Sequence, residues 1–143
     1  MTQVGAGCAQ PSGLPNILIP FNTPLIGQTY LAGAINQVPN PTLPGTPGGL
    51  TLQIRDQVFT GPVPLSIAFP ASSPSCFVFT GATLVDFLPT TTPFALAGFP
   101  IPPSISLVGG QLFHQVVNLI DPAGAGITMA SSSAAFQLTI GIY

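Results

Sequence analysis

The chain has 143 residues, but its only charged side chains are one arginine and three aspartates, which make up 3 % of the residues. Ordinary globular domains carry about 25 %. Without a basic cluster the composition excludes a nucleic-acid partner, and no apolar run reaches the roughly 18–20 residues of a membrane-spanning helix. The length fits one domain, so we expect a single domain over residues 1–143.

Short strands are predicted along most of the chain. Residues 1–15 are expected to form an extended arm that is pinned by Cys8. This end has no basic region followed by an apolar one, so no signal peptide is expected there, and Met1 also fits an expression start placed on a mature domain. The eight or nine strands that follow are predicted at 17–21, 29–38, 50–55, 65–69, 76–87, 94–99, 112–120, 127–130 and 136–143.

Two segments show the alternation of half-buried strands most clearly. In 50–55 the leucines and the isoleucine share one face, while Thr51, Gln53 and Arg55 share the other. In 136–143 the apolar residues at 136, 138, 140 and 142 likewise share one face. Such alternation predicts antiparallel strands with an apolar side toward the core and a polar side toward solvent.

The turns between these segments are rich in proline and glycine, of which the chain has 18 and 16. Proline cannot donate to a strand ladder, so it also protects edge strands from unwanted pairing. Many short strands with such turns predict an all-β fold, an antiparallel β-sandwich or jelly roll.

Titratable side chains are too few for a convincing active site. His114 and Asp121 allow a Ser–His–Asp arrangement by arithmetic, but no G-x-S-x-G elbow supports it. We expect no enzyme, no catalytic residue, no cofactor and no metal site. Asp121 in Asp-Pro-Ala-Gly is interpreted as a turn cap, with a calcium ion bound there as the open alternative. Arg55 is expected to pair with Asp86 or Asp121.

Aromatic and amide side chains suggest a second class of function, glycan binding. Sugar-binding faces usually present Trp or Tyr, and the chain offers only Tyr30 and Tyr143. The amides that would line a concave face are Asn36, Gln37, Gln53, Gln111 and Gln115. The phenylalanines expected to fill the inter-sheet core are Phe59, Phe69, Phe77, Phe79 and Phe87.

Cys8 and Cys76 are the only cysteines. An even pair in a chain this poor in charge suggests an oxidising compartment. A bridge would close a loop of nearly 70 residues and stabilise the fold by about 4 kcal/mol. Two reduced, buried thiols are the alternative.

A set of turn motifs spans nearly the whole chain. They are Gly5-Ala6-Gly7-Cys8, Ser12-Gly13-Leu14-Pro15, Pro24-Leu25-Ile26-Gly27, Pro64-Leu65-Ser66-Ile67, Cys76, the segment from Gln115 to Pro122, and Ser132-Ser133-Ala134 with Ile140-Gly141. This pattern resembles a C-terminal module of predicted secreted proteins from planctomycetes and some other environmental bacteria, which has no assigned activity. The resemblance implies a secreted β-module with a Cys8–Cys76 disulfide and no catalytic residues. Phe113-His114 departs from it, since another aromatic residue, often Trp, is expected beside the glutamine.

The function expected from these features is structural. A surface with almost no charge does not repel copies of itself, so we expect an extracellular module that self-associates into a filament, sheath or surface layer. A carbohydrate- or cell-surface-binding module is the main alternative, and a viral coat protein is a further one.

Overall fold

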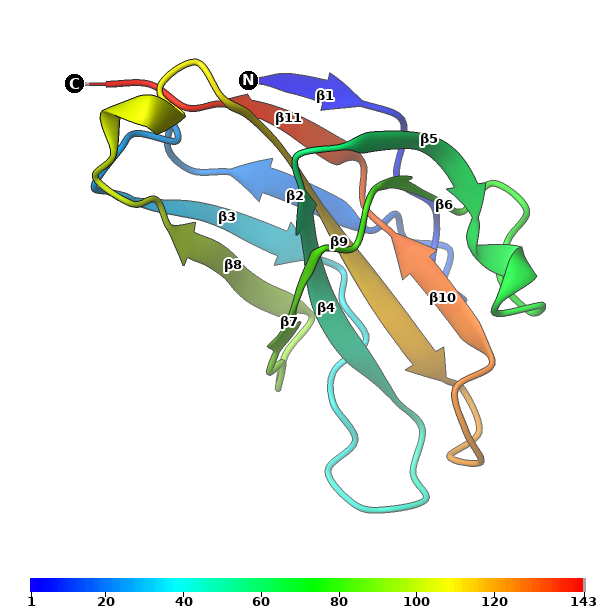
Figure 1. Cartoon of the computed structure of the whole chain (residues 1–143). Coiled ribbons are helices and arrows are strands. Elements are labelled where there is room, and N and C mark those ends of the chain that lie inside the picture. Colours follow the sequence, from blue (N-terminus) through cyan, green and yellow to red (C-terminus); the bar gives the residue numbers. More distant parts are fainter. Residues whose placement is uncertain (143) are drawn as a thin grey trace.

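The protein is an antiparallel β-sandwich in the computed structural model, which describes residues 1–142 (Figure 1). Within these residues a six-stranded sheet, a three-stranded sheet and a two-stranded hairpin account for eleven strands. Residues 1–142 contain no α-helix. The predicted all-β sandwich is confirmed. The strands are β1 (Thr2–Val4), β2 (Ile17–Pro20), β3 (Thr29–Ile35), β4 (Gly48–Asp56), β5 (Phe59–Pro64), β6 (Phe77–Thr80), β7 (Leu84–Leu88), β8 (Phe94–Pro100), β9 (Gln111–Asp121), β10 (Met129–Ser132) and β11 (Ala135–Thr139).

Strand β9 is the centre of the six-stranded sheet. It pairs with β4 on one side, from Gly48 opposite Asp121 to Asp56 opposite Phe113. On its other side it pairs with β10 and then β11, which Ser133 and Ala134 separate. Strands β7 and β1 lie at the two outer edges. The C-terminal strand β11 is therefore an inner strand, held between β9 and β1.

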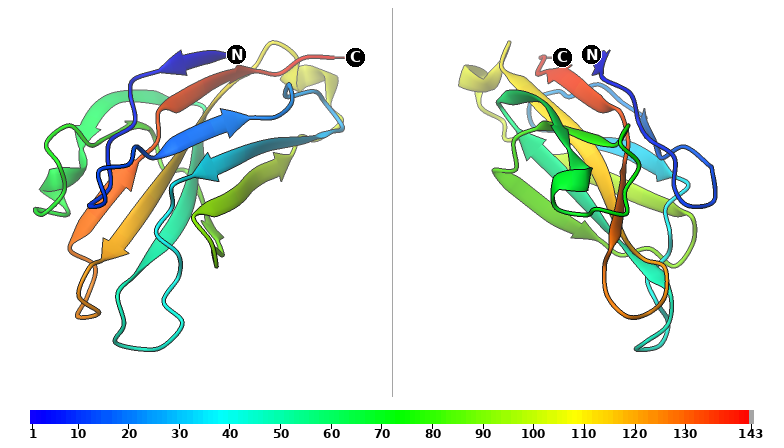
Figure 2. Two further views of the ribbon diagram at one scale, coloured as in Figure 1. Left: turned by 180° about the vertical axis from the view of Figure 1, so that it is seen from behind. Right: turned by 90° about the vertical axis from the view of Figure 1, so that its right-hand side faces the viewer.

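The three-stranded sheet, in the order β2-β3-β8, lies over one face of the large sheet (Figure 2). Its inward positions carry Leu18, Tyr30 and Phe99 together with small residues, of which Ala32, Ala34 and Ala97 are fully buried. They pack with Val116 and Leu138 of the large sheet in one core.

A second core lies on the opposite face of the large sheet, under the β5–β6 hairpin and a 3-10 turn at Leu65–Ile67. Cys8 and Cys76 form a disulfide there, with their Cα atoms 5.1 Å apart, which confirms the predicted bridge. The bond joins the N-terminal segment to the residue before β6, the second strand of the hairpin. The N-terminal segment is also paired through β1, whose Thr2 lies opposite Gln137 of β11.

Several sequence-based predictions need correction. The predicted strand 65–69 begins as a 3-10 turn, in which the N–H groups of Ala68 and Phe69 both donate to the carbonyl of Leu65. The run 76–87 divides into β6 and β7, which belong to different sheets. The chain bends at Gly81, where any side chain would overlap the carboxylate of Asp56. Strands β1 and β5 were not predicted.

The predicted phenylalanine core is also wrong. Phe59 and Phe87 are 46 % and 50 % exposed. Phe79 is buried, but it lies on the hairpin side, where its ring stacks on Phe59. The aromatic rings between the two sheets are those of Tyr30 and Phe99. Alternation alone does not tell which face of a strand meets which layer.

Candidate functional site

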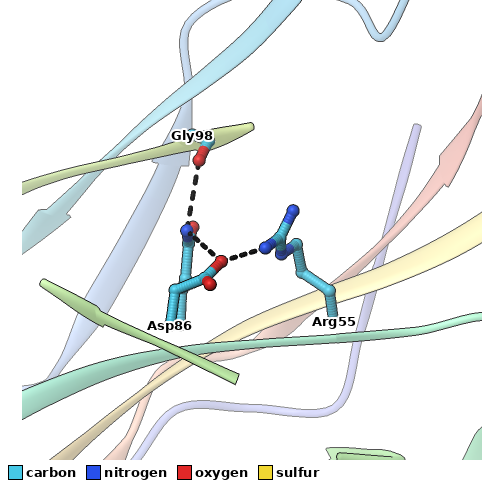
Figure 3. A network of polar contacts seen from close by, with 4 residues as sticks. Arg55, Asp86 and Gly98 are labelled. Carbon is cyan, nitrogen blue, oxygen red and sulfur yellow. Dashed lines mark hydrogen bonds and ion pairs between the residues drawn. The ribbon is translucent and has the colours of Figure 1, made fainter. Parts of the chain in front are cut away.

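The polar side of β4 faces the interior, contrary to the prediction. Thr51 and Gln53 are 0 % and 4 % exposed, and Arg55 lies between the sheets with them. Arg55 pairs with Asp86 of β7, which is one of the two partners predicted for it. Figure 3 shows this pair next to the carbonyl of Gly98. Gln53 Nε2 donates to Asp86 Oδ2 at 3.0 Å and to Gly98 O at 3.1 Å, so the network ties β4 to β7 and β8.

His114 of β9 lies beside this network and is completely buried. Its ring makes edge contacts with Tyr30 and Phe99, each with centroids 5.6 Å apart. Neither ring nitrogen has a hydrogen-bond partner within the described chain. Burial, with a smaller effect from the Arg55 charge, lowers the pKa of His114 to about 3, so the ring is neutral at physiological pH. Burial also raises the pKa of Tyr30. A substrate in solution would not reach either group.

Asp121 lies at the far end of β9 from His114. The two residues are seven positions apart on one strand, or about 23 Å, so they do not form a Ser–His–Asp arrangement. The carboxylate of Asp121 accepts hydrogen bonds from the N–H groups of Ala123, Ala125 and Gly126 at 2.9–3.2 Å, as the turn-cap interpretation predicts. Partial desolvation raises the pKa of Asp121, but these hydrogen bonds outweigh it and lower the pKa overall.

The calcium alternative at Asp121 gains no support from this geometry, because the three N–H donors point at the oxygens that a cation would need. Among residues 1–142, no group of three or more His, Cys, Asp or Glu side chains is placed to hold a metal ion.

The five amides expected to line a glycan-binding face do not form one surface. Gln37, Gln53 and Gln115 are buried, in three different surroundings. Gln115 Oε1 accepts from the Phe79 N–H at 2.9 Å, and its Nε2 donates to the carbonyls of Phe77 and Ser133 at 2.9 and 2.8 Å. It thereby fastens the hairpin to the large sheet. Tyr30 is fully buried, Asn36 donates to the Pro15 carbonyl, Gln111 is exposed at the start of β9, and Tyr143 lies outside the described residues.

The outer face of the three-stranded sheet carries large apolar side chains that remain exposed. The most exposed are Leu96 and Phe21, at 56 % and 55 %. The rings of Phe21 and Phe94 fill the space above Gly33, where a side chain would overlap both. We call this surface the small-sheet face. It consists of Ile17, Ile19, Phe21, Leu31, Ile35, Phe94 and Leu96.

A second apolar surface lies on the opposite side of the sandwich, where the hairpin leaves the large sheet uncovered. Phe87 and Val85 of the edge strand β7 are 50 % and 47 % exposed there. They lie opposite Leu52 and Ile54 of β4 in the ladder. We call this surface the large-sheet face. It consists of Leu50, Leu52, Val85, Phe87 and Leu119.

Both faces lack charged side chains. Arg55 extends between the sheets and pairs with Asp86, whose side chain is about half exposed at the edge strand β7. The other two aspartates lie at opposite ends of the large sheet, Asp56 at the end of β4 and Asp121 at the end of β9. Asp56 accepts hydrogen bonds from the side chain and the N–H of Thr83. Neither face therefore includes a charged side chain of residues 1–142, and Asp86, beside the large-sheet face, is neutralised by Arg55.

An open groove of about 510 Å³ lies at the end of the sandwich, between the β3–β4 loop and the β9–β10 loop. Figure 1 shows the two loops extending from the same end. Its walls include Pro39, Pro41, Pro47 and Pro122. Its one charged group, Asp121, is held by its own loop. The groove thus offers mainly proline rings.

No family model, curated protein or solved structure matches the chain. The resemblance to the secreted planctomycete module therefore stays a prediction. None of the helical segments in residues 1–142 is long and apolar enough to cross a membrane.

The sequence contained a signal for the small-sheet face that was missed. In 94–98 the residues alternate as Phe, Ala, Leu, Ala and Gly, and in 31–35 as Leu, Ala, Gly, Ala and Ile. Every position is apolar, so polarity does not show which side faces inward. The alanines at alternate positions do mark the inward side, whereas Gly33 lies on the outward side beneath the rings of Phe21 and Phe94.

Proposed function

We propose that this chain is a non-catalytic structural module of the extracellular space that associates with copies of itself, as a subunit of a filament, sheath or surface layer. The observation that carries the proposal is the pair of charge-free apolar faces on opposite sides of one sandwich. An ordinary soluble domain turns its polar residues outward, whereas this chain exposes Phe21, Phe94 and Leu96 and buries alanines behind them.

The area of these faces supports the proposal. If a large side chain offers about 150–200 Å² when fully exposed, the five most exposed residues of the small-sheet face present roughly 400 Å². A single patch of that size is already at the scale that is often functional in monomers. Two such faces packed together would cover about 800 Å² of apolar surface, which is in the range of weak and transient interfaces. We therefore expect reversible association that depends on concentration.

The disulfide supports an oxidising location such as the extracellular space. The charge composition also suits a location where proteases are met, because Arg55 is the only residue after which a trypsin-like protease could cleave the chain. Its side chain is 13 % exposed and lies within β4, between two neighbouring strands. A folded subunit of this kind would resist such proteases.

The placement of the titratable groups supports a non-catalytic role. His114 is sealed between the sheets, and Arg55 and Asp86 neutralise each other. The secreted module that the chain resembles has no assigned activity, which agrees with a structural role.

Sedimentation velocity tests the proposal directly. We expect the weight-average sedimentation coefficient to rise with protein concentration, and to rise equally in 10 mM and 1 M NaCl, because screening lengths of about 30 Å and 3 Å matter only for charges. Leu96→Asp places a charge on the small-sheet face and should suppress the rise. Leu43→Asp is the matched control, since Leu43 is 64 % exposed but lies in the β3–β4 loop. A monomer at every concentration would overturn the proposal.

A further inference from the structure

A small pocket lies between the N-terminal segment and two loops of the sandwich. Its walls come from the loop at residues 10–14, from the residues that follow β3 and from Pro93, which precedes β8, and its volume is about 270 Å³. The lining is mainly apolar. We call this site the amide pocket. It includes Gln10, Leu14, Gln37, Val38, Pro39 and Pro93.

The side chain of Gln37 brings a fixed acceptor to this pocket. Its Nε2 donates to Asn16 Oδ1 at 2.7 Å and to the Ile35 carbonyl at 3.0 Å, and Asn16 Nδ2 donates in turn to Ser131 Oγ at 3.3 Å. Because the Ile35 carbonyl can only accept, the nitrogen of Gln37 must face it. The oxygen Oε1 is therefore held on the other side, where it is buried and accepts no hydrogen bond within residues 1–142.

Gln10 brings an unused donor to the same pocket. Its side chain is 8 % exposed, and its Nε2 has no hydrogen-bond partner among the described residues. Its backbone is well fixed, since its N–H donates to the Leu14 carbonyl and its own carbonyl accepts from the Gly13 N–H, both at 2.9 Å. Buried polar groups are seldom left without a partner, so an unused donor and an unused acceptor at one pocket point to a ligand that pairs with both.

We propose that the amide pocket binds the acetamido group of an N-acetylated amino sugar. A secondary amide offers one acceptor, its C=O, and one donor, its N–H, which match the unused groups of Gln10 and Gln37. These two groups point in opposite directions in a trans amide, so the ligand would lie between the two glutamines. Gln10, whose nitrogen is unbound, is the side chain that turns to admit it. The acetyl methyl would contact Val38, Pro39 and Pro93.

The surroundings favour a sugar over a peptide as the source of this amide. Extended peptides often bind by adding to an exposed sheet edge, but loops border this pocket. Its volume lies just below the about 300–1,000 Å³ that is typical of ligand sites, which suits a single projecting group. The proline-lined groove adjoins the pocket and shares Val38 and Pro39 with it, so a second sugar ring has room there. This binding does not depend on the proposed self-association.

Saturation-transfer NMR with N,N′-diacetylchitobiose tests the inference, because the method detects weak ligands and works with a protein that associates. We expect the acetyl methyl protons to receive the strongest saturation. Cellobiose, which has hydroxyl groups in place of the acetamido groups, should bind at least about tenfold more weakly, since it lacks the amide that pairs with both glutamines. N-acetylalanine methylamide, the peptide control, should also bind more weakly than the disaccharide.

Variants at Gln10 locate the site. Gln10→Met removes the unused donor without breaking a side-chain hydrogen bond of its nitrogen, so we expect the fold to keep its stability and the affinity for N,N′-diacetylchitobiose to fall about tenfold. Gln10→Glu is the second variant, because a carboxylate cannot donate to the acetamido oxygen. Gln111→Met, at the exposed start of β9, is the matched control and should bind like the wild-type protein. Circular dichroism confirms that each variant is folded.

Four results would overturn the inference. They are no saturation of N,N′-diacetylchitobiose, equal binding of cellobiose, tighter binding of the peptide control than of the disaccharide, and undiminished binding by folded Gln10→Met and Gln10→Glu. The tighter peptide would show that the pocket recognises amides but not on a sugar. None of these results changes the sedimentation expected for self-association, so the two proposals fail separately.

Discussion

Both sides of the three-stranded sheet are apolar. Its inner side carries Leu18, Tyr30, Phe99 and four alanines and packs on the large sheet, whereas its outer side carries Ile, Leu and Phe that remain exposed. In most sandwiches the outward residues are polar. The inner side therefore serves the fold, through hydrogen bonds that join strands and loops, and the outer side is left for contacts with another molecule.

This comparison leads to opposite expectations for substitutions. Changes on the inner side or in the second core should lower the free energy of unfolding of the single chain. Changes on the outer side should leave that free energy almost unchanged and alter only association. The predictions below follow this order, from the largest expected effect on the monomer to the smallest.

Removal of the disulfide should cost the most. Cys8 and Cys76 are separated by 68 residues in the sequence, and Cys8→Ala/Cys76→Ala should lower the free energy of unfolding by about 4 kcal/mol through the entropy of the unfolded chain. Urea denaturation followed by circular dichroism measures the change. A loss below 1 kcal/mol would mean that the N-terminal segment contributes little to the fold.

Gln115→Met should lower the free energy of unfolding by about 3 kcal/mol. The substitution keeps the length of the side chain but removes its bonds to Phe77, Phe79 and Ser133, and each buried polar group left without a partner costs about 1–3 kcal/mol. Gln111→Met at the exposed start of β9 is the control and should have almost no effect. Equal effects at the two positions would contradict the role assigned to Gln115.

Acid should weaken the fold through His114. Its pKa falls from 6.5 in the unfolded chain to about 3 in the folded one, so the unfolded chain binds a proton that the folded chain does not. Stability is full above about pH 6.5 and declines as the pH falls toward 3, by about 1.4 kcal/mol for each unit. At pH 4.5 the loss should be about 2–3 kcal/mol.

The control for this effect is His114→Phe. Whatever the stability of this variant at pH 7, its free energy of unfolding should depend very little on pH between 6.5 and 4.5. Asp56 and Asp121 have lowered pKa values, so the stability that they contribute is lost only at lower pH, near and below 4. A wild-type slope that survives in His114→Phe would assign the titration to another group.

Leu96→Asp should have the smallest effect on the monomer. Because Leu96 is 56 % exposed, we expect the free energy of unfolding to change by less than about 1 kcal/mol, measured in dilute protein. The same substitution should remove most of the association. If it unfolded the monomer instead, the small-sheet face would belong to the core and not to an interface.

Much of the fold could be predicted from local patterns. Alternation and proline-rich turns located β2, β3, β4, β8 and β9, because each is a short apolar run between residues that favour turns. The side that faces inward could not be predicted at 50–55. There the polar residues are buried because Asn118 donates a hydrogen bond to the Thr51 hydroxyl and the Gly98 carbonyl accepts one from Gln53. Such partners are distant in sequence.

The candidate site was harder to predict for a related reason. The low charge indicated a surface suited to association, but the two faces arise only when β2, β3 and β8, or β4, β7 and β9, come together. Phe87 was assigned to the core because aromatic residues usually are buried. Its exposure follows from the position of β7 at a sheet edge that the β5–β6 hairpin does not cover.

Hydrogen exchange measured at low and high protein concentration tests the central claim most directly, because it locates the contacts between copies. The account predicts slower exchange at high concentration in Ile17–Pro20, Phe94–Pro100 and Leu84–Leu88, with no change in the hairpin strand Phe59–Pro64. Exchange that is independent of concentration, or protection confined to the hairpin, would contradict it.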